Sequence, residues 1–389
     1  MSSAPHSPKR LALLGATGSI GRQVCDLVAR YPERFQLRLA VAGHDAAGLD
    51  AIAGRHPGVR TILADVGGPK AASAATAIEA AVQEPEVDLV VVATAGSAGL
   101  GPSLAALEAG KDLALATKEV LVIAGQLVRE RMRRSGSQLL PVDSEHSAIW
   151  QCLWGEQRAA ARKLILTGSG GPFLRRPVET LESVTVSEAL AHPRWRMGPK
   201  ITVDSATMMN KGLEIIEAHY LFEMPFDDIE VVIHPQSVVH SMVQFIDGSI
   251  KAQLGVPDMH LPIAIALAYP ERLADVAEAP DLTAIGRLEF EPVDETRYPA
   301  IALARAAGAA GGTAPAILNA ANEVAVELFL KGRLRFVDII PAVRSCVEAA
   351  AVDHEVSLPA IMAADAWARA YVREWRPDVS IHRRSKRPA

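Results

Sequence analysis

The sequence predicts an α/β protein with an N-terminal doubly wound parallel sheet, a central α/β domain with a mixed sheet, and a C-terminal helical bundle. Three observations predict this fold class. Short strands rich in Val, Leu and Ala alternate with helical segments up to about residue 142. The strands that follow are longer and include a hairpin signal. The residues beyond 300 carry only helical periodicity.

The N-terminal region begins with the strand RLALLG, a glycine turn, the helical segment SIGRQVCDLVARY and the strand FQLRLAVAG. The strands VDLVVVAT, KDLALAT and QLLPV follow, with helical stretches between them. Strands that alternate with helices pair in parallel, because parallel neighbours need a crossover connection. We therefore expect a Rossmann-like, cofactor-binding domain over residues 1–142.

The central region, residues 143–270, contains the strands KLILTGSGG, IEVVIHP, SVVHSMVQF and SIKAQLG. The last two are joined across Asp247-Gly248, a two-residue signal for an antiparallel hairpin. We expect this region to be the catalytic domain, and residues 271–300, which contain several Pro and Ala, to be a linker. The segments APAILNAANEVAVELFL, RFVDIIPAVRSCVEAAA and VSLPAIMAADAWARAYVREW predict a helical domain over residues 301–389.

Composition narrows the class of protein. The 389 residues are 49% hydrophobic and 22% charged, which is enough for more than one core. The net charge of -5 argues against a nucleic-acid binder, whose affinity rests on neutralising phosphates. No apolar run approaches the length of a membrane span. The three cysteines lack the paired spacing of disulfides or zinc sites, so we expect a reducing cytoplasm.

The glycine turn Gly15-Ala-Thr-Gly18-Ser-Ile-Gly21 separates the first strand from the first helix. In a βαβ unit, this is where a dinucleotide pyrophosphate meets backbone N–H groups at a helix N-terminus. The spacing GxxGxxG differs from the common GxGxxG, and a simple tight turn is the alternative. The second strand ends at Gly43-His44-Asp45. Asp45 suits a ribose 2′-hydroxyl and a protonated His44 suits a 2′-phosphate, so these residues leave the cofactor open.

Three carboxylates are candidates for a metal site. The segment QLLPVDSEH ends in Asp143-Ser144-Glu145-His146, and a strand that persists through Glu145 places Asp143 and Glu145 on the same side. Glu214 is the third candidate. Converging carboxylates repel one another unless a cation neutralises them, and oxygen ligands favour Mg²⁺ or Mn²⁺ over zinc. An exposed turn is the alternative for an isolated Asp-x-Glu.

A dense polar cluster, VDSATMMNKGLE, spans residues 203–214 and precedes the amphipathic segment IIEAHYLF. On a helix, Asn210 and Glu214 are neighbours at i, i+4, and Lys211 and Glu214 at i, i+3. An amide, an ammonium and a carboxylate on one surface are suited to a phosphate and a metal together. The alternative is an exposed Lys-Glu pair.

Two loops add further candidates. Thr167-Gly-Ser169-Gly-Gly-Pro-Phe173 follows a strand, so Ser169 and the neighbouring amides suit a phosphate, with an ordinary glycine-rich turn as the alternative. The segment HPRWRMG, residues 192–198, lacks clear periodicity and combines His192 with Trp195, as a closing lid does. A structural His192 is the alternative.

In their order along the chain, these segments closely resemble the 1-deoxy-D-xylulose 5-phosphate reductoisomerase family. The resemblance covers nearly the whole chain and rests on the motifs GATGSIG, PVDSEH, LTGSGGPF, HPRWRMG, VDSATMMNKGLE, IHPQSVVHSMV and LNAANE. It implies an enzyme that uses NADPH and one divalent metal, Mg²⁺ or Mn²⁺. The reaction would convert 1-deoxy-D-xylulose 5-phosphate into 2-C-methyl-D-erythritol 4-phosphate for isoprenoid biosynthesis. The resemblance also implies a homodimer that fosmidomycin inhibits.

The resemblance further implies roles for individual residues. Asp143, Glu145 and Glu214 would bind the metal, and Lys118, Glu145 and His192 are the candidates for catalysis. It implies cofactor contacts for Thr17, Gly18, Ser19, Ile20, Gly43, Glu119 and Gly198. We add His44, Asp45, Thr117 and Met197 as further candidates for the cofactor. The sugar phosphate would be surrounded by Lys118, Ser144, Glu145, Ser169, His192, Trp195, Ser205, Asn210, Lys211 and Glu214.

Three segments depart from the usual pattern of the family. Thr117-Lys118-Glu119-Val120 replaces Asn-Lys-Glu-Ser, and Arg194 and Arg196 replace smaller polar residues in the lid. Gly43-His44-Asp45 replaces a Gly-Lys-Asn type of sequence, which removes a permanent cation and adds an anion near the expected 2′-phosphate. We therefore expect a weaker preference for NADPH over NADH than is usual in the family.

Two other interpretations compete with this one. A sister oxidoreductase on the same scaffold would act on a different sugar phosphate. A non-catalytic NADP-binding sensor would have lost the carboxylates or Lys118, and all of these are present.

Overall fold

The computed structural model describes residues 7–191 and 198–377. Within these ranges the chain forms two compact units. The first unit falls within residues 1–169 and 217–292, and the second within residues 170–216 and 293–389. Each unit therefore combines segments that are distant in the sequence.

The first unit contains a parallel sheet, sheet A, which has six strands among the described residues, in the order β3-β2-β1-β4-β5-β6. These strands are β1 (Lys9–Leu14), β2 (Phe35–Ala42), β3 (Arg60–Leu63), β4 (Leu89–Val92), β5 (Asp112–Leu115) and β6 (Leu139–Pro141). All four residues of β4 are buried, as expected for a central parallel strand covered on both faces. This strand order is that of a doubly wound, Rossmann-like sheet, so the predicted N-terminal fold is confirmed.

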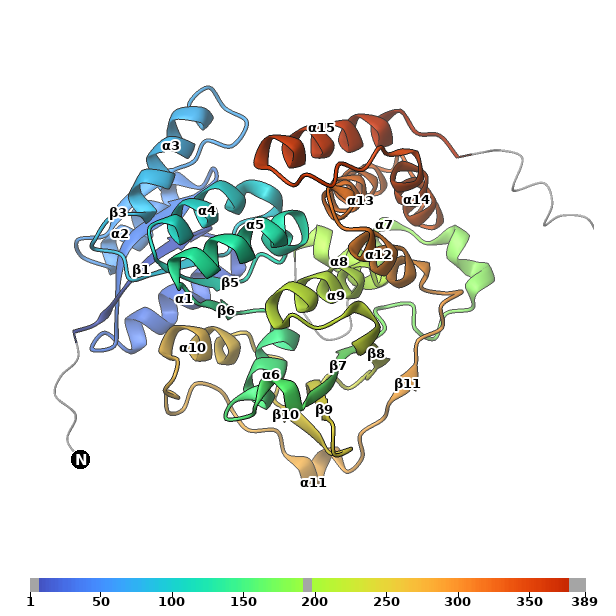
Figure 1. Cartoon of the computed structure of the whole chain (residues 1–389), viewed down its shortest axis with the longest axis horizontal. Helices are drawn as coiled ribbons and strands as arrows, with labels where there is room; N and C mark the ends of the chain where they lie inside the picture. The colour runs from blue at the N-terminus through green and yellow to red at the C-terminus, as the bar shows by residue number, and fades with distance from the viewer. Residues whose placement is uncertain (1–6, 192–197, 378–389) are drawn as a thin grey trace, which may run out of the picture. The chain divides into compact units, whose positions relative to one another are not determined.

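Helices cover both faces of sheet A (Figure 1). One core joins β1 and β2 to α1 (Ser19–Arg30), α2 (Ala46–Arg55) and α10 (His260–Ala268). α1 is amphipathic, with Val24, Leu27 and Val28 on its buried side. The other helices that connect these strands are α3 (Ala71–Val82), α4 (Leu100–Glu108) and α5 (Glu119–Ser135).

The first unit also contains a mixed sheet, sheet B, with the order β10-β9-β7-β8-β11 in the described part of the chain. Its strands are β7 (Ala161–Gly168), β8 (Ile229–Ile233), β9 (Val239–Phe245), β10 (Ile250–Leu254) and β11 (Glu291–Pro292). β7 and β8 are parallel, and the other pairs are antiparallel. β9 and β10 form the hairpin across Asp247-Gly248 that the sequence predicts. α6 (Ser144–Leu153) packs against β9 and β10.

The second unit is helical. Its bundle, orange to red in Figure 1, contains α12 (Pro299–Ala310), α13 (Ala314–Leu330), α14 (Ile339–Ala349) and α15 (Leu358–Glu374). α13 packs against the other three helices and against α8 (Pro199–Thr207), and nearly all of its residues are buried. Proline lies in the first turn of α8, α12, α13 and α15, where its missing N–H costs no helical hydrogen bond. The predicted C-terminal helices are therefore confirmed.

α9 (Met209–Phe222) crosses from the second unit into the first. It is separated from α8 by Met208, which has a φ of 60°. The remaining short segments are α7 (Val186–Ala189), α11 (Leu282–Ile285), η1 (Gly96–Gly99), η2 (Arg158–Ala160), η3 (Val178–Ser183), η4 (Phe226–Asp228) and η5 (Phe336–Asp338). Among the helices of residues 7–191 and 198–377, none is both long enough and apolar enough to cross a membrane.

The turn after β1 requires glycine because backbone atoms surround it closely. Gly15 has a φ of 86°, and a Cβ there would lie 2.2 Å from the carbonyl oxygen of Ala93. A Cβ on Gly21 would lie 2.2 Å from the carbonyl oxygen of Gly15. A carbonyl group cannot swing aside as a flexible side chain can, so the strand-to-helix turn closes only without these side chains.

We predict that Gly15→Ala destabilises the protein much more than Gly58→Ala. Gly58 has a similar φ of 81°, but a Cβ there would have nothing within 4 Å. Gly58→Ala should therefore cost only the left-handed strain of about 1 kcal/mol. Gly15→Ala adds the clash with Ala93 and should cost roughly 3 kcal/mol or more. Urea unfolding followed by tryptophan fluorescence measures both, and equal losses would contradict the packing argument.

Candidate active site

The nucleotide turn lies at the carboxyl end of β1, where α1 begins. Gly18 is the N-cap residue of α1, and no side chain caps the helix there. Gly18 and Ser19 are exposed, and the first turn contains no acidic residue. An uncapped, accessible helix N-terminus without a carboxylate is suited to an anionic pyrophosphate. The predicted cofactor residues Thr17, Gly18, Ser19 and Ile20 all lie at this turn.

The second strand ends at the same edge of sheet A, because β2 is parallel to β1. His44 is exposed there. Asp45 is the N-cap residue of α2, and its Oδ1 accepts a hydrogen bond of 2.8 Å from the backbone N–H of Gly48. Asp45 therefore has a structural role that the sequence interpretation did not consider.

A buried ion pair joins the ends of two neighbouring strands. Lys118 follows β5 at the N-cap of α5, and Asp143 follows β6 at the N-cap of α6. The Nζ of Lys118 lies 2.6 Å from the Oδ2 of Asp143, and the two side chains are 6% and 11% exposed. Just before Lys118, the hydroxyl of Thr117 donates to the carbonyl of Thr94 at 2.7 Å. Glu119 begins α5.

The strand does not persist through Glu145, which was the condition for strand alternation to place Asp143 and Glu145 on the same side. β6 ends at Pro141, and α6 begins at Ser144, directly after its N-cap Asp143. The Oδ1 of Asp143 accepts a hydrogen bond of 3.2 Å from the backbone N–H of Glu145, which favours helix over strand at this point. A carboxylate oxygen of Asp143 and one of Glu145 still lie within 4.8 Å of each other. The first turn of a helix, and not strand alternation, brings them together. The hydroxyl of Ser144 donates to Glu145.

His146 and Glu217 are buried neighbours of Asp143 that the sequence interpretation missed. The Nδ1 of His146 lies 3.4 Å from Asp143 Oδ1 and 3.4 Å from Glu217 Oε2, and both His146 and Glu217 are fully buried. Burial would raise the pKa of Asp143, but Lys118 and His146 outweigh it and hold that pKa well below its usual value. Asp143 is therefore ionised at neutral pH. The i, i+3 spacing from Asp143 to His146 was the signal in the sequence that could have identified His146.

The predicted trio on α9 is confirmed as a set of neighbouring groups. The amide of Asn210 donates to Oε1 of Glu214, and the ammonium of Lys211 donates to Oε2 of the same carboxylate. Lys211 is 3% exposed and Glu214 is 1% exposed, so the alternative of a solvent-exposed pair is wrong. The i, i+3 and i, i+4 spacing of a regular helix produces both contacts.

A second group of predicted residues lies at the glycine-rich turn after β7. Ser169 is half-buried, and Gly170 and Gly171 have φ angles of 80° and 67°. A Cβ on Gly171 would lie 2.7 Å from the carbonyl oxygen of Ser205, so the turn packs directly on α8. The lid residues His192, Trp195 and Met197 lie outside the described residues. Gly198 is the N-cap residue of α8.

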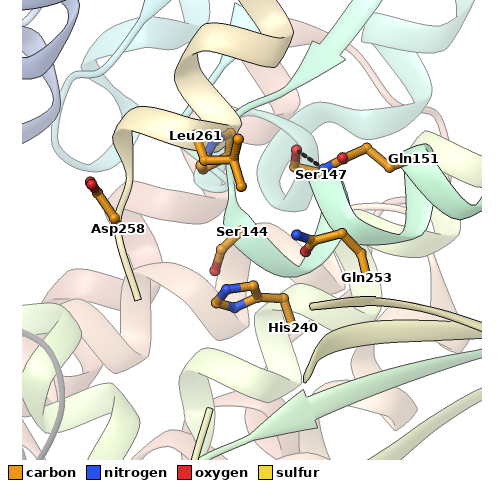
Figure 2. A pocket seen from close by; sticks show the side chains of 8 residues that line it. Ser144, Ser147, Gln151, His240, Gln253, Asp258 and Leu261 are labelled. Carbon is orange, nitrogen blue, oxygen red and sulfur yellow. Dashed lines mark hydrogen bonds between the residues drawn. The ribbon is translucent and has the colours of Figure 1, made fainter. Parts of the chain in front are cut away.

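A small pocket opens beside Ser144 in the first unit (Figure 2). Its lining comes from three regions, and the figure shows the side chains of Ser144 and His240 pointing into it. The lining residues are Ser144, Ser147, Gln151, His240, Gln253, Asp258, Leu261 and Pro262. The Nε2 of His240 lies 3.3 Å from the carbonyl oxygen of Val256. The sequence interpretation gave no role to His240, because a lone strand histidine carries no distinctive signal.

The cysteines offer no reactive thiol. Cys25, Cys152 and Cys346 are free and buried. Burial raises the pKa of Cys25 and Cys152 to about 11, and that of Cys346 to about 12. Since the thiolate is the reactive form, these cysteines are structural.

Three family profiles match successive parts of the chain. A 1-deoxy-D-xylulose 5-phosphate reductoisomerase profile matches residues 11–125, and a C-terminal domain profile of the same enzyme matches residues 139–222. A profile described as the DXP reductoisomerase C-terminal domain matches residues 254–371.

The chain is similar over nearly its whole length to proteins named 1-deoxy-D-xylulose 5-phosphate reductoisomerase. One from Heliobacterium modesticaldum is 51% identical over 380 residues, which are 94% of this chain and 97% of that protein. One from Pseudomonas putida, strain W619, is 49% identical and covers 94% of this chain and 98% of that protein.

Solved structures give the same result. The structure of the Zymomonas mobilis enzyme in complex with NADPH has a TM-score of 0.86 and 40% identity. A DOX-P reductoisomerase in complex with NADPH, fosmidomycin and magnesium has a TM-score of 0.87 and 38% identity. Each alignment covers 94% of this chain and 98% of the other. The chain therefore belongs to the 1-deoxy-D-xylulose 5-phosphate reductoisomerase family.

Proposed function

We propose that this chain carries out the reaction of its family with residues at the carboxyl edge of sheet A and on α8 and α9. The reaction is the NADPH- and divalent-metal-dependent conversion of 1-deoxy-D-xylulose 5-phosphate into 2-C-methyl-D-erythritol 4-phosphate. One observation carries the assignment of residues. The nucleotide turn after β1 and the buried Lys118–Asp143 pair after β5 and β6 share one edge of a parallel sheet. That edge is where open α/β sheets bind their ligands.

The position of the nucleotide turn at this edge of sheet A supports its assignment to the cofactor. We assign the pyrophosphate to the turn Thr17–Ile20, because the uncapped start of α1 with its exposed residues Gly18 and Ser19 suits an anion. Bound NADPH supplies the hydride that reduces an aldehyde. The other residues that we assign to the cofactor are Gly43, His44, Asp45, Thr117, Glu119, Met197 and Gly198.

We assign the metal to Asp143, Glu145 and Glu214. Ionised carboxylates are the ligands that Mg²⁺ and Mn²⁺ prefer, and the low pKa of Asp143 keeps it in that form. The bound metal supplies a Lewis acid that stabilises negative charge on the carbonyl and hydroxyl oxygens of the substrate. His146 lies beside Asp143, and Glu217 lies beside His146. Together they would orient Asp143, as buried partners of metal ligands do. α9 supports the inclusion of Glu214, which lies one helical turn before Glu217 on the same helix.

The remaining polar residues are assigned to the sugar phosphate. Ser169, Ser205, Asn210 and Lys211 would bind the phosphate and fix the orientation of the substrate. Ser144 and Trp195 would contact the rest of the substrate. Lys118 and Glu145 are our candidates for proton transfer, and His192 is a further catalytic candidate. This assignment is compatible with a retro-aldol/aldol route and with a direct ketol shift.

We also propose the functional domains, the assembly and the location of the protein. The cofactor domain is residues 1–142, the metal- and substrate-binding domain 143–270, the linker 271–300 and the helical domain 301–389. Sheet A within the first range and the strands β7 to β10 within the second support this division. The resemblance to the family supports a homodimer, and the three free cysteines support a reducing cytoplasm.

The direct test of the function is oxidation of NADPH on addition of 1-deoxy-D-xylulose 5-phosphate. We predict oxidation with Mg²⁺, none after treatment with a chelator, and recovery when Mg²⁺ is added back, measured by absorbance of the reduced cofactor. NADPH without substrate is the control. If oxidation never depends on the metal, the sister oxidoreductase acting on another sugar phosphate becomes the better assignment.

We predict that Glu214→Gln abolishes turnover and leaves NADPH binding intact, because the amide removes a metal-binding charge outside the nucleotide turn. Turnover is measured at saturating Mg²⁺, and NADPH binding by fluorescence titration. Glu223→Gln is the matched control, since Glu223 follows the same helix but pairs with Arg129 and Arg133. The control should keep its activity. Full activity of Glu214→Gln at saturating Mg²⁺ would refute the metal assignment.

We predict a weaker preference for NADPH over NADH than is usual in the family, because no permanent cation follows Gly43. The double substitution His44→Lys and Asp45→Asn should raise the ratio of kcat/KM for NADPH to that for NADH several-fold. Asparagine also caps helices well, so α2 should stay intact. Asp50→Asn removes an exposed charge elsewhere on α2 and should leave the ratio unchanged. Strong discrimination in the unmodified chain would contradict the prediction.

A further inference from the structure

Two motifs in the second unit meet in a buried hydrogen bond that the proposed function does not use. The amide Nδ2 of Asn322 on α13 donates to Oδ1 of Asp204 on α8 at 2.8 Å. The other carboxylate oxygen of Asp204 lies 2.9 Å from the Nζ of Lys200, one turn earlier on α8. Asn322 is fully buried and Asp204 is 1% exposed. A polar link therefore fixes α8 against the central helix of the bundle.

This buried hydrogen bond joins the two helices at a cost in stability. Most of the buried residues of α13 are Ala, Val, Leu or Ile, and an apolar residue at 322 would pack without any polar group to satisfy. The Oδ1 of Asn322 is buried and has no hydrogen-bond partner in the described part of the chain. A buried polar group that is only partly satisfied lowers stability, and such departures from the best packing are expected at sites that serve function.

The predicted phosphate residue Ser205 follows Asp204 on α8, and its backbone lies against the glycine-rich turn. Gly171 packs on the carbonyl of Ser205, with no room for a Cβ. The glycine-rich turn is itself fixed from α12, because the hydroxyl of Tyr298 donates to the carbonyl of Gly170 at 2.7 Å. Arg297 adds hydrogen bonds of 2.8 Å and 2.7 Å to the carbonyls of Phe173 and Arg176. α8 thus contacts both this turn and α13.

We propose that Asp204 and Asn322 are positioning residues for the phosphate subsite. Their hydrogen bond sets the position of α8 against the Gly170–Gly171 turn, and so sets where the Ser205 hydroxyl meets the substrate's phosphate. This inference rests on the proposed function of Ser205. It gives a role to Asp204 and to the LNAANE motif, which the assignment of metal, cofactor and substrate residues left unexplained.

The test exchanges the two side chains. Asn322→Asp sets two buried carboxylates against each other, which should displace α8 and raise KM for 1-deoxy-D-xylulose 5-phosphate roughly tenfold, with KM for NADPH unchanged. The double variant Asp204→Asn with Asn322→Asp restores an amide–carboxylate hydrogen bond and should recover most of the loss. Asn322→Ala, a milder change, should raise the same KM and serves if the Asp variant does not fold.

A second readout does not depend on turnover. Inorganic phosphate should raise the thermal midpoint of the unmodified chain, and this shift should shrink in Asn322→Asp and Asn322→Ala and return in the double variant. If the phosphate shift follows this pattern but no turnover occurs, the proposed function fails while the positioning role stands.

Asp365→Asn is the matched control for stability. Asp365 is another buried carboxylate of the second unit, and it pairs with Arg369 on its own helix at 2.6 Å. Its loss should lower the thermal midpoint and leave KM and the phosphate shift unchanged. The positioning role is overturned if the Asn322 variants also change only the thermal midpoint, or if the double variant is no better than Asn322→Asp alone.

Discussion

The arrangement of the site in the first unit depends on the buried carboxylate of Asp143. A carboxylate in this position needs compensation, because burial disfavours its charge. Lys118 supplies an ammonium at 2.6 Å, and His146 adds an imidazole. The same side chain caps α6 by accepting from the backbone of Glu145. One residue therefore joins two strand ends, starts a helix and remains ionised. Removing one partner of such a buried pair typically costs about 3–5 kcal/mol.

In the second unit, Glu214 is another buried carboxylate whose charge is compensated by neighbouring donors. This carboxylate is almost fully buried, and Asn210 and Lys211 each donate to one of its oxygens. The residues proposed for the phosphate thus also compensate the residue proposed for the metal. In the same unit, the glycine-rich turn makes a close backbone contact with α8, and a buried hydrogen bond joins Asp204 of α8 to Asn322 of α13.

Local rules predicted much of the site. The contacts among Asn210, Lys211 and Glu214 follow from helical spacing alone, and the turn at Gly15 follows from a strand, three glycines and a helix in sequence. Strand alternation does not relate Asp143 to Glu145, because β6 has only three residues and Asp143 is the N-cap of α6. A short polar run in the sequence does not reveal such an N-cap. His146 and Glu217 were missed because their meeting joins α6 to α9, which are distant in sequence.

The sequence by itself determined the fold class, the family and the identity of the polar residues, since strand and helix periodicity and the long motifs are local properties. Only the tertiary structure decided which of these residues are buried and which partners compensate them. In the structure, Asp45 caps a helix, Glu145 lies on a helix, and Asp204 accepts a hydrogen bond from Asn322. The physical reason is that burial and compensation depend on elements packed from distant parts of the chain, which no local pattern specifies.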